Sequence, residues 1–458
     1  MLVLPLRMGV RVAGLPAASV VPAGRTASLS ADVLIPAAGV HRVLLTPHLL
    51  RKDPSRVTAN TTDVDTGQGL GAARPGLLVL SLSVFAGVTT ETLPVGLLPT
   101  ISRTFGVAQS TTGLLVSLYA GLVALLAVPL TLATRRIPRK RLLVIATSCF
   151  LLSNVLSALA PSFAVLAVAR ALGGTAHAVF FSLCIGYAAR LVPPARTGRA
   201  LALASAGISA GFVLGVPLAT VLGNAVGWRG SFAALSALMA LALILITVRL
   251  PGVEAAVSQE PPGPGRRRGL VAVVTSNALV YLGQYTLYTY VSVLLLRSGA
   301  GSSAVGPILL VFGGFGLVGV WIAGPQLDRR PRSSAIVVLA LLGAGLVGTG
   351  ASFPSLTLVI IAGAVWNGAF GPVASVHQTA AVRTRAASPD LAGAWVVATS
   401  NVGIALGAAL GGGILDDAGI QNVAWAAAVA IAMAVSVVVL ERRAFPDRPP
   451  ADTTAEKP

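Results

Sequence analysis

The chain has 458 residues, of which 55% are hydrophobic and 10% are charged, and its formal net charge is +18 at pH 7. An ordinary soluble domain has about 25% charged residues, so this composition, with a mean hydropathy of +0.84, excludes a soluble protein and indicates a membrane protein. The positive charge by itself would suggest nucleic-acid binding. Because it is concentrated in alternate loops between apolar segments, it indicates membrane topology instead, and we expect no nucleic-acid partner.

The first 75 residues are not apolar enough to cross a membrane. They carry many arginines, and Asp32 is their first acid. We expect residues 1–75 to be a disordered extension or a stretch upstream of the true translation start, which would lie near Val57. An organellar targeting segment is the alternative. We expect function to survive deletion of this stretch.

Twelve apolar segments follow, each near the length of about 20 residues that a helix needs to cross a bilayer. We expect membrane-spanning helices at residues 76–100, 111–134, 142–160, 163–189, 199–222, 232–250, 270–296, 304–327, 333–351, 355–381, 391–412 and 421–440. Their apolar runs are continuous, whereas strands of a membrane barrel alternate apolar and polar residues. The predicted fold class is an all-α membrane protein with twelve transmembrane helices.

The loops between these segments alternate in charge. One set is rich in arginine and lysine, at residues 135–141, 190–199, 249–268, 329–332, 383–385 and 442–443. The other set holds only Arg103, Arg229 and Arg297. By the positive-inside rule the rich side is cytoplasmic. We therefore expect a multi-pass protein of the plasma (inner) membrane with both termini in the cytoplasm.

Two pairs of motifs recur at nearly one spacing. Arg136-x-Pro138-Arg139 matches Arg329-x-Pro331-Arg332 at an offset of 193 residues. GISAGFVLG (207–215) matches GIALGAALG (403–411) at an offset of 196. Each pair falls in equivalent segments of two sets of six. A duplicated six-helix unit around a central cavity is typical of transporters, although the glycines are also explained by tight helix packing.

This duplication predicts the domain organisation. We expect an N-terminal six-helix half at residues 76–250 and a C-terminal half at residues 270–440. A cytoplasmic linker at residues 251–269 would join them, and a cytoplasmic tail would follow at residues 441–458. The two halves are expected to be pseudo-symmetric.

Residues 324–332 resemble the Gly-x-x-x-Asp-Arg-x-x-Arg loop signature of the major facilitator superfamily, through Gly324, Asp328, Arg329 and Arg332. The first-half copy, which includes Arg136 and Arg139, departs from that pattern. Thr131 stands where the family has glycine, and Arg135 stands where it has aspartate. The resemblance implies that these loops gate the cytoplasmic side. The missing aspartate leaves Asp328 to carry that role alone.

Residues 215–232 resemble the fifth-helix antiporter signature of arabinose-efflux-type and chloramphenicol-resistance-type exporters in this superfamily. ETLPVGLLP (91–99) and NVGIALGAALGG (401–412) resemble the same subgroup. The resemblance spans roughly residues 76–440 and implies the twelve-helix fold with two pseudo-symmetric halves. It assigns the antiporter-type motif to Gly207, Gly211, Gly215 and Pro217.

Glu91 is the only acid well inside an apolar segment, and Arg170 is the only deep base. Such a charge costs about 2.5 to 3.5 kcal/mol on insertion scales and usually marks an ion or proton path. At about 1.5 Å per residue, Glu91 lies roughly 13 Å and Arg170 roughly 10 Å below the same face. The superfamily resemblance makes the first and fourth helices neighbours and likens Arg170 to a fourth-helix basic residue linked to proton coupling.

These positions lead to the hypothesis that Glu91 takes a proton from outside and releases it inside, while Arg170 and substrate compete for its charged form. Pro94 and Pro99 would bend the helix that must rock. A permanent ion pair with a structural role is the alternative.

The seventh segment supplies candidate cavity residues. Tyr281, Tyr285 and Tyr288 fall on one helical face with Gln284 beside them, and their rings suit flat or amphiphilic substrates. Interfacial aromatic residues are the alternative. Further polar candidates are His177, Asn367 and Asn401. The asparagines equally suit contacts between helices. His177 could relay protons, and a hydrogen-bonded interior histidine is the favoured alternative.

The sequence has no G-x-x-x-x-G-K-[ST] loop, so we expect no ATP-driven step. It also lacks a recognisable nucleophile and base, and we expect neither an enzyme nor a metal or cofactor. The predicted function is export of small drug-like compounds by proton antiport, as in multidrug resistance. Sugar efflux, proton-coupled uptake and a non-transporting sensor are the alternatives. The expected partners are a small-molecule substrate, protons and the lipid bilayer, and we expect a monomer.

Overall fold

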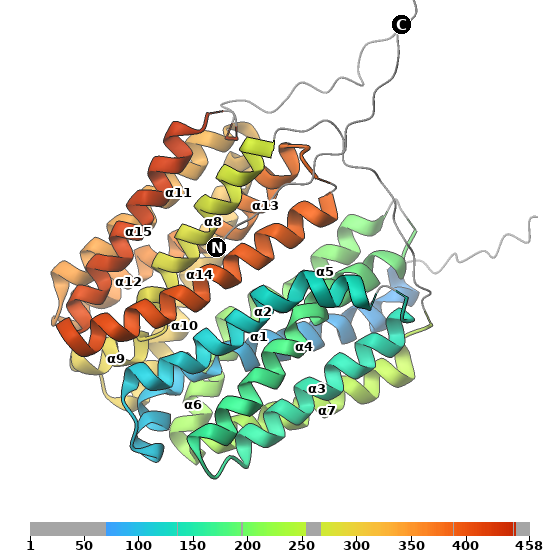
Figure 1. Cartoon of the computed structure of the whole chain (residues 1–458), viewed down its shortest axis with the longest axis horizontal. Coiled ribbons are helices and arrows are strands. Elements are labelled where there is room, and N and C mark those ends of the chain that lie inside the picture. Colours follow the sequence, from blue (N-terminus) through green and yellow to red (C-terminus); the bar gives the residue numbers. More distant parts are fainter. Residues whose placement is uncertain are drawn as a thin grey trace, which may run out of the picture. The chain divides into compact units, whose positions relative to one another are not determined.

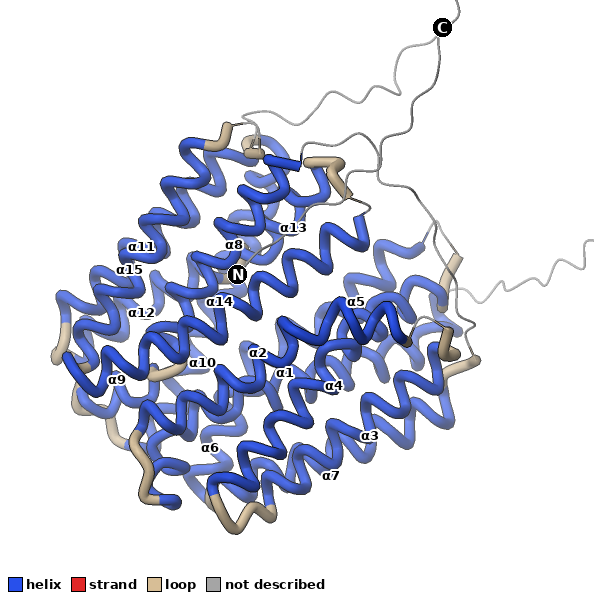
Figure 2. Tube along the Cα trace, in the orientation of Figure 1, coloured by secondary structure: helices blue, strands red, loops and turns tan. Residues whose placement is uncertain are grey.

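The computed structural model describes residues 70–134, 136–193, 196–252, 267–387, 389–442 and 444–445, and every regular element in these ranges is a helix (Figures 1 and 2). Apolar runs of this length form helices in a bilayer because a helix satisfies its own backbone hydrogen bonds. The expected extension up to residue 69, most of the expected linker and the end of the expected tail lie outside the described residues.

The first half of the chain forms six spans. Its elements are α1 (Leu70–Phe105), α2 (Gln109–Ala133), α3 (Arg139–Ala158), α4 (Phe163–Arg190), α5 (Thr197–Ala210), the π-helical turn η3 (Gly211–Gly215), α6 (Val216–Val226) and α7 (Trp228–Arg249). Helices α5 and α6 with η3 between them make one span. Helix α1 starts within the predicted extension and runs past the predicted end at residue 100, because its inner prolines do not stop it.

The second half repeats this plan. Its elements are α8 (Arg267–Tyr288), α9 (Val291–Arg297), α10 (Ser302–Arg329), α11 (Pro331–Ser352), α12 (Leu356–Phe370), α13 (Val373–Arg383), α14 (Pro389–Ala418) and α15 (Ile420–Leu440). Within the described residues, twelve spans are long and apolar enough to cross a membrane, which confirms the predicted fold class. Breaks at Thr289–Tyr290 and Gly371–Pro372 divide two spans that the sequence predicts as continuous.

The glycine repeat packs one helix against another in the same way in both halves. A Cβ at Gly207 would overlap the carbonyl of Ser81 on α1, and a Cβ at Gly403 would overlap the carbonyl of Ala278 on α8. Glycine is needed at these positions because the two backbones touch. The packing explanation therefore holds for both glycines.

The remaining repeat glycines extend the same two contacts. Gly211 and Gly215 lie against Val88 and Thr89 of α1, and their counterparts Gly407 and Gly411 lie against Leu282 and Thr286 of α8. Pro217 lies in the first turn of α6 and is buried. Gly207, Gly211 and Gly215 therefore hold the fifth span against α1, the helix that carries Glu91.

Four tight turns lie at one side of the bundle, which we call the glycine-turn side. Each contains a glycine with positive φ, namely Gly106, Gly227, Gly299 and Gly419. In Figure 1, α1 to α7 and α8 to α15 form two groups of helices, and α2 and α14 run along the border between them. The core of the second half continues across this border onto Val95, Leu98 and Val116 of the first half.

Candidate functional site

The candidate site is centred on helix α1, which carries Glu91. Next to Glu91, a proline leaves one carbonyl group of this helix without a helical donor. Pro94 has no N–H, so the carbonyl of Thr90 can accept a hydrogen bond from elsewhere. Arg170 on α4 supplies it, since Nη1 lies 2.6 Å from that oxygen. Nη2 of Arg170 donates to the carbonyl oxygen of Glu91 at 2.7 Å. The structure thus brings Glu91 and Arg170 together through the main chain of α1.

Arg170 is fully buried and is stabilised on two sides. Its Cζ lies 4.3 Å from the centroid of the Tyr119 ring on α2, close enough for a cation–π interaction. The two carbonyl oxygens of α1 accept its N–H groups on another side. This arrangement anchors the guanidinium without using the carboxylate of Glu91, which leaves that carboxylate available to other partners.

The carboxylate of Glu91 lies next to a histidine. Its Oε2 is 3.7 Å from Nδ1 of His177, a contact that is an ion pair only when the histidine is protonated. The same Nδ1 lies 3.2 Å from the hydroxyl oxygen of Tyr119, and the imidazole packs on the ring of Phe181 at 4.3 Å between centroids. His177 is therefore hydrogen-bonded within the bundle and also adjacent to Glu91.

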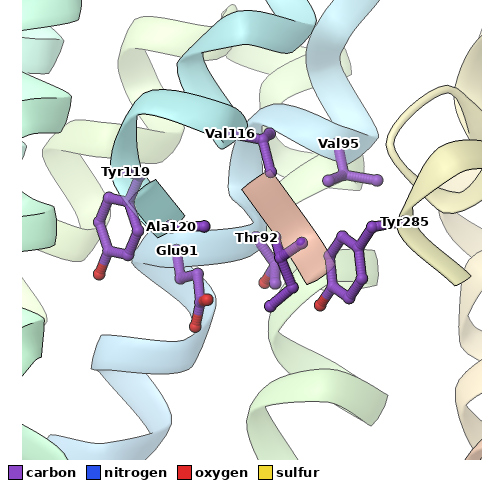
Figure 3. A pocket seen from close by; sticks show the side chains of 8 residues that line it. Glu91, Thr92, Val95, Val116, Tyr119, Ala120 and Tyr285 are labelled. Carbon is purple, nitrogen blue, oxygen red and sulfur yellow. The ribbon is translucent and has the colours of Figure 1, made fainter. Parts of the chain in front are cut away.

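A small pocket adjoins this cluster at the border between the two halves. Its lining residues come from α1, α2, α8 and α14, and they are Glu91, Thr92, Val95, Val116, Tyr119, Ala120, Tyr285 and Ile404. The gaps between its lining atoms add up to about 220 Å³, but no single gap is wide enough for a water molecule. In Figure 3 the carboxylate of Glu91 and the hydroxyl groups of Tyr119 and Tyr285 point towards the same side of the pocket.

The predicted tyrosines of the seventh span have different surroundings. Tyr285 lines the pocket. Tyr281 stacks beside it with 6.3 Å between ring centroids and is partly exposed. Tyr288 packs edge-on against Trp366, away from the pocket lining. The tyrosine face therefore contributes one ring to the pocket and supports that ring with the other two.

The predicted amides make contacts within the second half. Oε1 of Gln284 accepts a hydrogen bond of 2.6 Å from Nε1 of Trp366. Nδ2 of Asn367 donates to Gly363 and Nδ2 of Asn401 donates to Val397, each one turn back in its own helix. None of these three amides lines the pocket in this conformation.

The predicted gating residues lie at the side opposite the glycine turns. Arg136 and Arg329 are exposed, and Arg139 is half-buried. A Cβ at Gly324 would enter open space. Asp328 lies one residue before the end of α10, and its side chain is outside the part of the chain that the structure describes.

One basic residue in each of these two regions donates hydrogen bonds to the carboxyl end of the last helix of its own half. Nη2 of Arg332 donates to the carbonyl of Val439 on α15 at 2.7 Å. Nζ of Lys140 donates to the carbonyls of Thr247 and Leu250 at the end of α7, at 2.9 and 2.5 Å. A cation at this end of a helix is favourable because the last carbonyl groups have no helical donors.

Tyr119 is a site residue that the sequence pattern does not predict. It touches Arg170, His177 and the pocket at once. In the sequence it is one tyrosine within an apolar run, and such a residue is usually packed core. Tyr119 faces the fourth helix only because of how the helices pack, and the residue spacing within the second segment does not indicate this.

Two six-helix halves with a carboxylate in a pocket on their border define a membrane transporter built from a structural repeat. The sequence pattern of the Major Facilitator Superfamily matches residues 80–388. The chain belongs to this superfamily. It is therefore a transporter with a small-molecule substrate, a multi-pass membrane protein and not an enzyme.

Two relatives show which transporters it is similar to. A chloramphenicol efflux pump of Mycobacterium tuberculosis is 34% identical over 354 residues, which cover 73% of this chain and 84% of the pump. A protein of Mannheimia succiniciproducens named "Probable sugar efflux transporter" is 31% identical over 373 residues, which cover 80% of this chain and 93% of that protein.

Solved structures show the same fold. The inward-facing, unoccupied crystal structure of a bacterial homologue of the human lysosomal transporter Spinster has a TM-score of 0.67 at 18% identity, covering 83% of this chain and 99% of that one. The crystal structure of the human organic anion transporter MFSD10 has a TM-score of 0.62 at 18% identity, covering 80% and 99%. At this identity the likeness concerns the fold alone.

Proposed function

We propose that this protein exports small organic, drug-like compounds in exchange for protons. The observation that carries the proposal is the Glu91 carboxylate in a pocket lined by helices of both halves. An acid buried in a membrane helix is costly and usually serves an ion or proton path. Rocking of the two halves around this pocket would expose the carboxylate to one side of the membrane and then to the other.

The surroundings of Glu91 suit a group that changes its charge. Arg170 is anchored by carbonyl groups and Tyr119, so it supplies a fixed positive charge nearby. Nδ1 of His177 lies 3.7 Å from Oε2 of Glu91. His177 is therefore a group beside Glu91 that can also bind a proton. Glu91 would bind a proton when the pocket faces outward and lose it when the pocket faces inward and substrate enters.

The pocket lining favours a flat, largely apolar substrate. Tyr119 and Tyr285 offer ring faces with hydroxyl groups, and Val95, Val116 and Ile404 offer aliphatic surface. Rings of this kind bind amphiphilic compounds by stacking and hydrogen bonding. The relative named as a chloramphenicol efflux pump supports a drug-like compound. The relative named for sugar efflux supports the second candidate, because sugars also stack on aromatic rings.

We further propose that the side with the basic loops faces the cytoplasm, as the positive-inside rule favours. Both termini would then be cytoplasmic, the plasma membrane would be the location, and residues 251–269 would link two halves of one monomer. The segments around Arg136 and Arg139 and around Asp328 and Arg332, where helices of each half end and begin, would close the cytoplasmic side.

Inverted membrane vesicles test this function. Respiration acidifies their lumen, and a pH-sensitive dye reports proton release when chloramphenicol or arabinose is added outside. We expect chloramphenicol to release protons with the unmodified protein and with Glu441→Gln, a matched change of an exposed acid. Glu91→Gln should abolish the release at unchanged protein level, because its amide cannot carry the proton.

A response to arabinose alone would favour sugar efflux over drug export. Proton release that persists undiminished in Glu91→Gln would contradict the role of Glu91. No release with either compound or with a wider panel, from protein shown to be folded, would count against proton-coupled export.

A further inference from the structure

The last of the three prolines inside α1, Pro99, frees another carbonyl group, and a residue of the opposite half uses it. Pro99 has no N–H, so the carbonyl of Val95 lacks its helical donor. Oγ of Ser292 on α9 donates to this oxygen at 2.8 Å. Val95 and Ser292 are both fully or almost fully buried. This hydrogen bond therefore joins the two halves directly in a dry environment, where an unsatisfied carbonyl would be costly.

The same contact lies where the two halves are related to each other. The repeat glycines place Ser81, Phe85 and Thr89 of α1 at positions equivalent to Ala278, Leu282 and Thr286 of α8, and all three pairs are 197 residues apart. Val95 and Ser292 have that same separation. Equivalent residues of two pseudo-symmetric halves touch only near the axis that relates the halves. The hydrogen bond therefore lies near this axis, beyond the pocket on the glycine-turn side.

A neighbouring tyrosine closes the gap between α2 and α14. Tyr290 occupies the break between α8 and α9, and its hydroxyl donates to the carbonyl of Ala408 on α14 at 2.8 Å. Its ring and hydroxyl group lie where a Cβ at Gly113 on α2 or at Gly412 on α14 would have to fit. Tyr290 is thus anchored by a hydrogen bond in the second half and packs against the backbone of Gly113 in the first half.

We propose that Ser292 and the carbonyl of Val95 form the closing contact of a gate at the glycine-turn side, with Tyr290 filling the gap beside it. Both Ser292 and Tyr290 are then positioning residues of the transport cycle. This inference rests on the proposed rocking of the two halves. It goes beyond the proposed function because it names which atoms must separate when this side opens.

The gate is coupled to the carboxylate by its position on α1. Val95 lies one helical turn after Glu91, and both line the same pocket. When Ser292 leaves, the carbonyl of Val95 needs a new donor, and water is the available one. Opening the gate therefore brings water within one turn of Glu91. The second half has no acid at the equivalent position, which is Tyr288, so this coupling belongs to one half.

Spin-label distances in the purified full chain test the gate without substrate or a proton gradient. Labels at Ala108 and Asn422 report opening of the glycine-turn side, because both residues are exposed there and lie in different halves. Cys149 and Cys184 are first replaced by alanine in every variant. We expect Ser292→Ala to raise the ratio of long to short distances about fivefold, the effect expected from losing one buried hydrogen bond. Ser303→Ala, an exposed serine on the same side, is the control.

A second variant tests the role of the proline. Pro99→Ala restores an N–H that can satisfy Val95 within α1, so Ser292→Ala should have less than half its effect in that background. Distances in Ser292→Ala that match those of Ser303→Ala would overturn the gate. An undiminished effect of Ser292→Ala beside Pro99→Ala would overturn the proline-freed carbonyl as its acceptor. Either result is independent of whether the protein exports drugs by proton exchange.

Discussion

The guanidinium of Arg170 donates a hydrogen bond to the carbonyl oxygen of Thr90, with 2.6 Å between nitrogen and oxygen. Pro94 leaves this carbonyl without a helical donor. A proline on one helix and an arginine on another therefore act as one unit. The arginine gains a buried acceptor, and the carbonyl group that Pro94 leaves without a helical donor gains a hydrogen bond. A proline three residues after Glu91 is tolerated in a membrane-spanning helix when a neighbour satisfies the freed carbonyl group in this way.

The first prediction concerns this unit. Arg170→Met leaves the carbonyl of Thr90 buried without a partner, so we expect a loss of about 1–3 kcal/mol in the free energy of unfolding. Adding Pro94→Ala to Arg170→Met supplies a helical N–H to Thr90 and should recover part of that loss. Unfolding by denaturant in detergent micelles measures both. Pro99→Ala is the matched control because its N–H reaches Val95, and a rescue of equal size by this variant would contradict the pairing.

The second prediction separates the two functions of the Tyr119 side chain. Tyr119→Phe removes the hydroxyl group near His177 but keeps the ring beside Arg170, so we expect a loss of about 1 kcal/mol. Tyr119→Leu removes the ring as well and should lose roughly 0.5–2 kcal/mol more. The same unfolding assay compares them. Equal losses in the two variants would show that the ring does not stabilise the guanidinium.

The third prediction concerns the glycines. Gly207→Val and Gly403→Val should each prevent normal folding or lower the thermal unfolding temperature strongly, because each side chain would overlap a backbone carbonyl of the neighbouring helix. Gly324→Ala should leave stability within about 1 kcal/mol of the original, since its Cβ enters open space and alanine favours a helix. Gel filtration in detergent and thermal unfolding test all three. A Gly403→Val protein as stable as the original would refute the equivalence of the two contacts.

The fourth prediction concerns the end of α7. Lys140→Met removes the ammonium group that contacts the last carbonyls of this helix, so we expect a loss of about 1 kcal/mol. Arg136→Met changes an exposed basic residue in the turn just before α3 and should have a smaller effect. Thermal unfolding at low ionic strength distinguishes them. The contact contributes nothing if the two variants unfold together.

The fifth prediction tests the gap that Tyr290 fills. Gly113→Ala places a methyl group against the hydroxyl and ring of Tyr290, so the closed glycine-turn side should become less populated. Adding Tyr290→Phe removes the nearest clashing atom and should restore part of the closed population. The distance between labels at Ala108 and Asn422 reports both. An unchanged distance distribution in Gly113→Ala would argue against contact at this point.

Much of the architecture could be predicted because it depends on composition and periodicity. Long apolar runs in a membrane must be helices, so the number of spans and the family could be read from residue types and motifs. The sequence did not predict the helix breaks beside Tyr290 and Pro372. Whether a proline or a tyrosine breaks a helix depends on which neighbours satisfy the freed backbone groups: Pro94 and Pro99 leave α1 continuous because Arg170 and Ser292 do so.

The candidate site divides in the same way. Glu91 and Arg170 are conspicuous in the sequence because charged residues are rare in apolar segments. The free-energy cost of placing a charge in the membrane is enough to single them out. Tyr119, Ser292 and Tyr290 are ordinary residues of such segments, and they matter here only through what they touch. Contacts between helices depend on how the helices rotate and tilt against each other, a choice made by the packing of all of them together. Residue types and their spacing thus established a two-half helical transporter with one buried acid, whereas the folded bundle alone determined which side chains hold that acid's helix.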